Sequence, residues 1–247
     1  MDLYLSPEAL PTEVAKEVQV SRLSQRIRSC LLALPVIGLA SLPPAAALTP
    51  QEELIDKSRM SFEKLITHPE FTELKGYVQH AKAVLIIPSL LKGGFFIGGE
   101  GGSGVLIARR PEGGWGQPAF YTLGAGSLGI QFGGQVSEVV FTFMTEQGLN
   151  AVLTNQVKLG AEVSIAVGPM GKSVGAGTTT NFGSDMYMFA KSEGLFGGGA
   201  LQGAVIAKRD DWNQGFYGRP VTPRQIILTN EVANPRADPL RQVLAPY

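Results

Sequence analysis

Residues 92–110 read KGGFFIGGEGGSGVLIARR, and this stretch decides the fold class of the chain. Its aromatic and branched apolar residues, such as Phe95, Val105 and Ile107, favour a pleated, half-buried surface. Each intervening glycine would destabilise a helix by about 1 kcal/mol relative to alanine. In strands, glycine is typical of a bulge, a bend or the close approach of another backbone. The pattern therefore predicts two strands with a sharp turn or bulge near Glu100–Ser103.

A similar stretch recurs 99 residues later, as KSEGLFGGGALQGAVIAKR at residues 191–209. Seven of the 19 aligned positions are identical, and both copies begin with lysine and end in a basic pair. A chance match between two glycine-rich segments is the alternative, because a firm repeat needs self-similarity over a longer period. If the repeat is structural, it places two similar hairpins in one sheet or barrel.

The composition favours a β-rich core around this stretch. Of the 247 residues, 44% are hydrophobic and only 17% are charged, against the usual quarter. The net charge is zero, so no global field draws the protein to nucleic acid. We expect an α+β fold, with a curved, mostly antiparallel β-sheet or barrel-like core and N-terminal helices packed on it.

The first 47 residues have the pattern of a secretory signal peptide with an N-terminal extension. Three arginines precede a 13-residue apolar run at residues 30–42, and the alanines of residues 45–47 follow it. The run is shorter than the about 20 residues that span a bilayer. We therefore expect cleavage near Ala47, a single domain over residues 48–247, and a location in the periplasm or cell envelope.

Apolar spacing predicts the elements outside the glycine-rich stretches. Thr49 before Pro50 fits an N-cap followed by a first-turn proline, and the helix that begins there should end near His68. Its apolar stripe is expected to pack on the sheet, with a membrane-surface helix as the alternative. We further expect a helix at 71–80, strands at 83–88, 119–128, 135–144 and 158–167, a helix at 145–156, a hairpin within 174–191, a second glycine-rich strand pair at 195–208, a short helix at 222–228 and an irregular tail.

Three glycine motifs resemble nucleotide-binding signatures but lack their context. Gly99–Gly104 and Gly124–Gly129 fit G-x-G-x-x-G, which needs a helix after it, whereas residues 105–110 are strand-like. Gly168–Ser173 resembles the end of a phosphate loop, but Ala166 stands where the first glycine belongs. We therefore predict that the protein binds no nucleotide.

The sequence also offers little for catalysis. The only cysteine, Cys30, lies before the expected cleavage site, and the two histidines, His68 and His80, fall at predicted helix ends. A histidine triad or a zinc site has too few parts. Nothing in the spacing of the carboxylates asks for a glycosidase pair. We predict no catalytic residue, no metal and no cofactor.

Five long stretches carry a family resemblance. Residues 81–231 contain AKAVLIIPSLLKGGFFIGGEGGSGVLIARR, GGWGQPAFYTLGAGSLGIQFGGQVSEVVFTFMTEQGLNAVL, KLGAEVSIAVGPMGKS, KSEGLFGGGALQGAVIAKRDD and YGRPVTPRQIIL. This region resembles the SYLF domain family, a lipid-binding module of bacterial secreted proteins and of eukaryotic actin and endocytic proteins. The resemblance implies binding to anionic phospholipids, to phosphoinositides in eukaryotes and to actin in some members, and it carries no established catalytic residues. With a signal-peptide pattern and no SH3 domain, this sequence points to envelope phospholipid rather than to phosphoinositide or actin.

We therefore expect non-catalytic binding of anionic phospholipid at a bacterial envelope membrane. A structural or protein-interaction module of the envelope is the alternative, and an enzyme ranks third. Because the net charge is zero, a local basic patch must attract the lipid. The candidate residues stand at the two ends of the repeated stretches: Arg109, Arg110, Lys208 and Arg209 as one cluster, if the hairpins lie side by side, and Lys92 and Lys191 as a second.

An alternative for these basic residues is that they are ordinary solvated strand ends. Glu112, Asp210 and Asp211 adjoin them and would neutralise them. In that case we expect the lipid site to lie elsewhere, on the apolar face of the helix that contains Leu54 and Phe62.

Overall fold

The computed structural model describes residues 47–94, 97–128, 133–154, 156–168, 183–193 and 203–247. The predicted signal peptide lies outside these ranges, as do residues 174–182 of the hairpin predicted within 174–191 and residues 195–202 of the strand pair predicted at 195–208. The description below concerns the unit Ala47–Tyr247.

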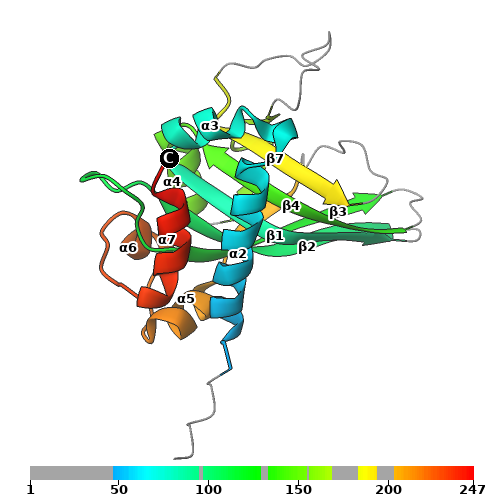
Figure 1. Ribbon diagram of the computed structural model, residues 1–247. Helices are drawn as coiled ribbons and strands as arrows, with labels where there is room; N and C mark the ends of the chain where they lie inside the picture. The colour runs from blue at the N-terminus through cyan, green and yellow to red at the C-terminus, as the bar shows by residue number, and fades with distance from the viewer. Residues whose placement is uncertain (1–46, 95–96, 129–132, 155, 169–182, 194–202) are drawn as a thin grey trace, which may run out of the picture. The chain divides into compact units, whose positions relative to one another are not determined.

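An eight-stranded curled sheet forms the centre of this unit (Figure 1). Neighbouring strands are antiparallel, except for one parallel pair at an edge. The predicted α+β fold with a curved, mostly antiparallel sheet is therefore confirmed. The strands are β1 (Ala83–Gly94), β2 (Ile97–Ala108), β3 (Ala119–Leu128), β4 (Gly133–Phe143), β5 (Val157–Lys158), β6 (Ile165–Val167), β7 (Met186–Glu193) and β8 (Val205–Lys208), in the spatial order β5-β8-β3-β2-β1-β4-β7-β6.

The two edge strands explain why the sheet curls. β5 and β6 lie at opposite ends of the strand order, although only a few residues separate them along the chain. Between them, Gly160 turns the chain at φ 79°, and Leu159 forms a bridge with Val163. A connection this short draws the two edges of the sheet toward each other. The single strand predicted over 158–167 is wrong, because the turn at Gly160 splits it between the two edges.

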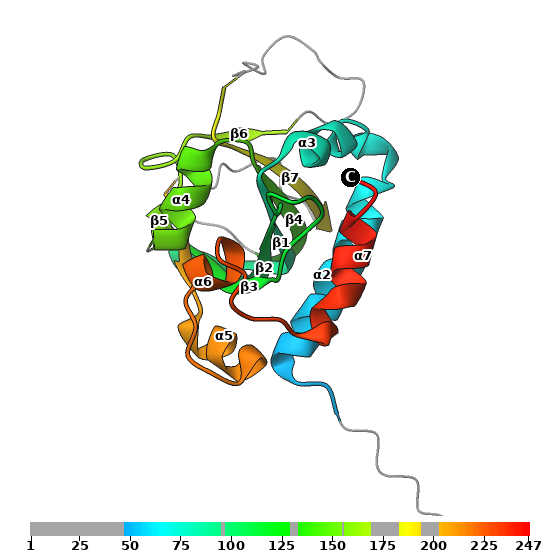
Figure 2. The same cartoon turned by 90° about the vertical axis from the view of Figure 1, so that its left-hand side faces the viewer.

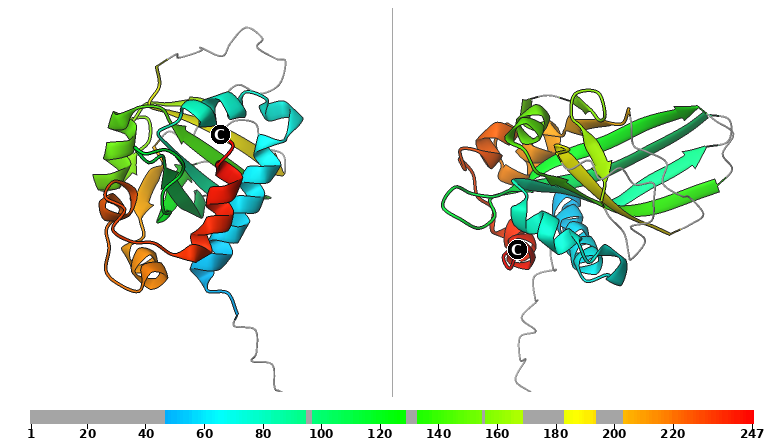
Figure 3. Two further views of the ribbon diagram at one scale, coloured as in Figure 1. Left: turned by 60° about the vertical axis from the view of Figure 1, so that its left-hand side comes forward. Right: turned by 90° about the horizontal axis from the view of Figure 1, so that it is seen from above.

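Helices cover both faces of the sheet (Figures 2 and 3). The face toward which the sheet curls, called here the inner face, packs against α4 (Glu146–Thr154) and α6 (Pro223–Ile227). The opposite outer face packs against α2 (Pro50–Ile66), α3 (Leu74–His80), α5 (Asp210–Tyr217) and α7 (Asp238–Leu244).

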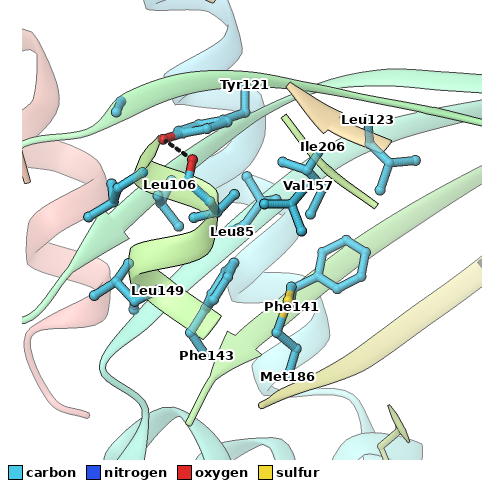
Figure 4. Packing of buried hydrophobic residues seen from close by; sticks show 14 of the residues in the cluster. Leu85, Leu106, Tyr121, Leu123, Phe141, Phe143, Leu149, Val157, Met186 and Ile206 are labelled. Atoms are coloured by element: carbon cyan, nitrogen blue, oxygen red, sulfur yellow. Dashed lines mark hydrogen bonds between the residues drawn. The ribbon is translucent and has the colours of Figure 1, made fainter. Parts of the chain in front are cut away.

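Each face has its own hydrophobic core. Val84 and Ile86 of β1 enter the outer core, whereas Leu85 enters the inner core, so the strand reads as a continuous apolar run. In the inner core, the Tyr121 hydroxyl donates to the carbonyl oxygen of Val152 in α4 at 3.2 Å (Figure 4). Burial raises the pKa of this tyrosine far above its usual value.

The apolar stripe of α2 packs on the outer face, as expected. Leu54, Phe62 and Ile66 are 7%, 0% and 3% exposed. The alternative of a membrane-surface helix is therefore wrong, because this face is buried against the sheet. At its start, Thr49 and Glu52 form a reciprocal capping box and Pro50 occupies the first turn, which confirms the predicted N-terminus.

The glycine-rich stretch differs from its prediction. Glu100–Ser103 lies inside the continuous strand β2, so no turn occurs there. The irregularity lies opposite, where the register of β1 shifts between Ile86 and Leu91. Pro88 stands within this bulge, where a missing N–H is tolerated, and β1 therefore continues past the proline at which it was predicted to end.

The two repeated stretches lie in one sheet but do not form two similar hairpins. β1 and β2 pair with each other, whereas β7 and β8 are separated by four strands. The expectation of side-by-side hairpins is therefore wrong. Sequence similarity at the strand level did not specify which strands pair.

The C-terminal region is more helical than predicted. The short helix α6 begins at Thr222, which forms a capping box with Gln225, as expected. The tail was expected to be irregular, but it contains a 3₁₀ turn (Pro235–Ala237) followed by α7. Pro235 and Pro239 occupy first-turn positions, where the ring suits the helix and the absent N–H is no loss. Helix α5 was not predicted at all.

Candidate functional site

Arg109, the first predicted site residue, is built into the fold. Its guanidinium donates to the carbonyl oxygens of Ala81 at 3.0 Å and of Val78 and Gln79 at 2.9 Å, and also to a Tyr247 oxygen. The same group stacks on Trp115, 4.6 Å from the ring centroid. Partial burial lowers the pKa of Arg109 below its usual value, although an arginine remains charged. Arg109 therefore connects the end of α3 to the C-terminal segment.

The other three strand-end residues each pair with an acidic residue two positions later. Arg110 donates from Nε to Glu112 at 2.6 Å, and Lys208 Nζ lies 3.1 Å from Asp210. These acidic residues were identified from the sequence as neutralising neighbours, and the structure confirms the pairing.

Arg209 shows the most complete of these pairs. Its guanidinium makes two hydrogen bonds to the Asp211 carboxylate, at 2.9 and 2.8 Å, and stacks on Trp212. The hydrogen bond from Arg209 lowers the pKa of Asp211, and the same bond raises the pKa of Arg209. The stacking on the indole helps to hold the guanidinium in place.

The strand register separates the two basic pairs. Lys208 lies opposite Tyr121 of β3, and Tyr121 lies opposite Gly104 of β2. Arg109 stands five residues further along the chain than Gly104, which is about 16 Å at the usual rise of a strand. Arg109 and Arg110 therefore occupy a different region from Lys208 and Arg209, and the four residues do not converge.

The second predicted cluster, Lys92 and Lys191, is divided between the two faces of the sheet. Lys92 pairs with Gln135 in the register of the inner face. Lys191 lies opposite Glu138, on the outer face. The Glu138 carboxylate in turn accepts from Ser61 at 3.1 Å and contacts Lys64 of α2 at 3.0 Å. The two lysines therefore do not form one patch.

A surface that the sequence analysis missed lies at the glycine-rich end of the sheet. Leu91 of β1 and Val136 of β4 face each other in register and are 58% and 44% exposed. Beside them, Gly101 and Gly124 are paired on β2 and β3. The next row on the outer face consists of glycines on four adjacent strands: Gly126, Gly99, Gly93 and Gly134. We call Leu91, Val136 and these glycines the open sheet face.

The open sheet face consists mostly of glycines, and the packing of the fold does not require glycine at Gly99, Gly101 or Gly126. A methyl group added at Gly126 would meet nothing within 4 Å, and one at Gly99 or Gly101 would make only ordinary contacts. Glycine in a strand is destabilising unless it marks a bulge or the close approach of another group. The glycines themselves are visible in the sequence, but only the strand register shows that they align across neighbouring strands.

Only the first of the three motifs that resembled nucleotide signatures is fully described, and it lacks the required context; Gly124–Gly129 and Gly168–Ser173 extend outside the described residues. Gly99–Gly104 lies within β2, and strand rather than helix follows it. The described part of the chain holds no group of three or more metal-ligating side chains. His68 accepts the N–H of Glu70 at a helix start, and His80 lies 2.8 Å from the carbonyl oxygen of Gly76. Both histidines therefore have the helix-end positions that were predicted. Within the described ranges, no helix is long and apolar enough to cross a membrane.

These features define an α+β domain with two cores, whose strand-end cations are paired and whose glycine-rich sheet end bears few side chains among the described residues. Residues 124–247 match the Ysc84 family, described as "Las17-binding protein actin regulator". The chain belongs to this family, as its resemblance to SYLF domains indicated.

Proteins similar to this chain occur in yeasts and animals. Protein YSC84 of Saccharomyces cerevisiae is 32% identical over 170 residues, covering 68% of this chain and 36% of that protein. SH3 domain-containing protein PJ696.02 of Schizosaccharomyces pombe is 34% identical over 164 residues, covering 65% and 38%. Human SH3 domain-containing YSC84-like protein 1 is 27% identical over 188 residues, covering 76% and 53%. The chain thus spans about a third to a half of the length of these relatives.

Proposed function

We propose that this protein is a non-catalytic binding domain for anionic phospholipid, acting at a bacterial envelope membrane to which its leader directs it. The observation that carries this proposal is the open sheet face. Leu91 and Val136 present adjacent apolar side chains to solvent, next to glycines that are aligned across four strands. Apolar side chains that gather on a surface are typical of a protein or membrane contact.

The charges beside this surface are mixed, since Glu193 of β7 lies opposite Val136 and Lys191 lies opposite Glu138. Lys191 lies on the same face, one strand from Val136 and displaced along the sheet. A lysine near an anionic surface contributes about 1 kcal/mol of attraction. Lys208 and Arg209 contribute less attraction to the membrane, because the carboxylates of Asp210 and Asp211 compensate their charges.

Vesicle sedimentation of residues 47–247 tests the proposal. We expect binding to vesicles that contain phosphatidylglycerol and much weaker binding to pure phosphatidylcholine. The double variant Leu91→Thr/Val136→Thr keeps β-branched residues in both strands while removing apolar surface. It should weaken vesicle binding by about tenfold or more, given about 1.5–3 kcal/mol for burying a Leu or Val side chain.

Val167→Thr is the matched control, because Val167 is also a strand residue and is also 44% exposed, but lies on the edge strand β6. It should bind vesicles like the unmodified protein. If both variants bind equally well, the open sheet face is not the membrane contact. If the unmodified protein ignores the anionic vesicles, the proposed function is wrong.

A second candidate function is protein binding, and the family description favours it, since it names a Las17-binding actin regulator. The open sheet face would serve a protein partner as well as a membrane. Co-sedimentation with actin filaments distinguishes the two. Binding to filaments but not to anionic vesicles would favour the protein-interaction function.

The location is tested separately. Cleavage near Ala47 predicts a mature protein without Cys30, recovered from the periplasmic or envelope fraction. Intact-mass spectrometry of the protein from its native cell shows whether cleavage occurs, and a species that retains Cys30 would contradict the proposed processing.

A further inference from the structure

A small cleft lies beside the end of β2, apart from the open sheet face. Its volume is about 260 Å³, below the range of roughly 300–1,000 Å³ that is usual for pockets of drug-sized ligands. The segment that follows β2, the segment that follows α6 and helix α7 all contribute to its wall. The lining includes two arginines, two side-chain amides and two small apolar residues: Arg110, Arg241, Gln117, Asn230, Val232 and Ala233.

Gln117 contributes a side-chain amide to this cleft. The residue is only 8% exposed, and its Oε1 accepts the backbone N–H of Asn234 at 3.1 Å. This bond assigns the oxygen, so Nε2 carries two N–H groups. In the described part of the chain, Nε2 is not one of the buried polar atoms that lack a partner, so its N–H groups are open to water or to a ligand at the cleft.

The two arginines add further donors. Arg110 uses Nε and Nη2 to bind the Glu112 carboxylate. Arg241 donates from Nε to the carbonyl oxygen of Trp115 at 3.0 Å and from Nη1 to Asp238 at 2.7 Å. Each guanidinium has five N–H groups, so each retains three that these contacts do not use.

The cleft is also a place of unusual backbone geometry. Asn230 has φ 48°, the only positive φ of a non-glycine residue among those described. Gly116 lies against it: a Cβ at Gly116 would stand 3.4 Å from the Asn230 side-chain oxygen and 3.5 Å from Arg110 Cγ. Residues held in sparsely populated backbone regions cluster at ligand sites.

We propose that this cleft binds a phosphoryl group through Arg110, Arg241 and Gln117. Arginine forms paired N–H···O bonds with phosphate, and a tetrahedral phosphate offers more acceptor oxygens than a carboxylate, matching donors that approach from several elements. The phosphoryl group can belong to a lipid headgroup or to a soluble phosphate. Only the lipid source rests on the proposed function.

The acidic partners of the two arginines do not prevent a phosphoryl group from binding. The side chains of Glu112 and Asp238 are 54% and 45% exposed, so both carboxylates can turn to solvent when an anion binds. Exposed ion pairs of this kind contribute little to stability. Arg241 is held more firmly than its acidic partner, since its Nε also donates to the carbonyl oxygen of Trp115.

Three variants of the full chain test the site. Gln117→Glu keeps the acceptor for Asn234 but replaces the amide N–H groups with a repelling oxygen. Arg110→Gln removes one guanidinium. Arg209→Gln is the matched control, because Arg209 also stands at a strand end and also pairs with a carboxylate two residues later, but does not line the cleft.

The first measurement is calorimetric titration with inorganic phosphate at constant ionic strength. We expect binding by the unmodified chain and by Arg209→Gln, and a loss of about tenfold or more in affinity for Gln117→Glu and Arg110→Gln, since charge-assisted bonds are about twice as strong as neutral ones. Absence of phosphate binding, or an equal loss in all three variants, would overturn the site. Circular dichroism shows whether each variant is folded.

The second measurement uses the vesicles described above, which separates the two sources. Phosphate binding without vesicle binding leaves the site standing for a soluble phosphate and overturns the proposed function. Vesicle binding that is weakened by Gln117→Glu and Arg110→Gln assigns the headgroup to the cleft. Vesicle binding that no cleft variant affects, together with no phosphate binding, overturns the site and leaves the proposed function intact.

Discussion

At the residue scale, the glycines of the central stretch divide into two groups with different physical causes. A Cβ at Gly102 would lie 2.6 Å from the carbonyl oxygen of Ser89, and one at Gly104 would lie 2.9 Å from that of Ile86. These two glycines make room for the bulge of β1. Gly99 and Gly126 have no such neighbours, so their small size serves the surface rather than the fold.

This division predicts opposite effects of two alanine substitutions. Gly104→Ala should lower the free energy of unfolding by about 1–3 kcal/mol, because the added methyl group meets backbone that cannot easily move. Gly126→Ala should leave it unchanged or raise it by up to about 1 kcal/mol, because alanine restricts the unfolded chain. Urea unfolding of both variants decides, and equal effects would contradict the two-group interpretation.

A second residue-scale prediction concerns Arg109. The sequence suggested that Arg109 binds lipid, whereas the structure gives its guanidinium three carbonyl oxygens, a Tyr247 oxygen and a stacking partner. Arg109→Ala should therefore lower stability by about 2–4 kcal/mol, since a single hydrogen bond to a charged group contributes about 1.5–3 kcal/mol. Arg110→Ala, whose ion pair is exposed, should change stability by less than about 1 kcal/mol. A thermal unfolding comparison that shows equal losses would remove the structural role of Arg109.

At the element scale, the sequence was informative wherever a local signal determined the structure. The capping residues Thr49 and Thr222 located the starts of α2 and α6, and β3 begins and ends where predicted. The failures involve choices made by tertiary contacts. Residues 158–167 alternate like one strand, but their two ends pair with opposite edges of the sheet, as β5 and β6. The strand pairing of the repeat likewise depends on contacts far apart in the chain.

Asp185, just before β7, connects the starts of α4 and β6, and its carboxylate predicts that the stability of the fold depends on pH. Its carboxylate accepts from the hydroxyl of Thr145 before α4 at 2.6 Å, and from the backbone N–H and hydroxyl of Ser164 before β6 at 3.0 and 2.7 Å. Burial alone would raise the pKa of Asp185, but the hydrogen bonds from Thr145 and Ser164 outweigh it and lower that pKa. The folded state therefore binds this proton more weakly than the unfolded state does.

The stabilisation from Asp185 should be complete above the unfolded pKa of about 3.9 and should disappear as the pH falls through the lower folded pKa. Asp185→Asn should lower stability by about 1–2 kcal/mol at pH 6. The difference between the two proteins should shrink in urea unfolding at about pH 3. A difference that stays constant between these pH values would mean that the charge of Asp185 does not contribute.

At the scale of the whole molecule, composition predicted a β core but not its two-sided burial or the position of the site. The basic pairs were visible in the sequence, together with their acidic neighbours. Their separation was not, because it follows from the register of β8, β3 and β2. The open sheet face and the cleft also come from residues that only the folded chain brings together. Arg241, for example, lies 131 positions after Arg110, yet both line one cleft.

The outer core joins the two ends of the described unit, and this yields the last prediction. Helix α7 packs beside α2: Leu244 is fully buried, its carbonyl oxygen accepts the indole N–H of Trp115 at 2.9 Å, and Tyr247 contacts the Phe62 ring edge-on. Leu244→Ala should lower the free energy of unfolding by about 2–5 kcal/mol, as expected for a core cavity. Leu228→Ala, at a site 40% exposed, should change it by less than about 0.5 kcal/mol. Urea unfolding followed by tryptophan fluorescence measures both, and a Leu244→Ala loss no larger than that of the control would mean that α7 is not part of the core that holds the fold together.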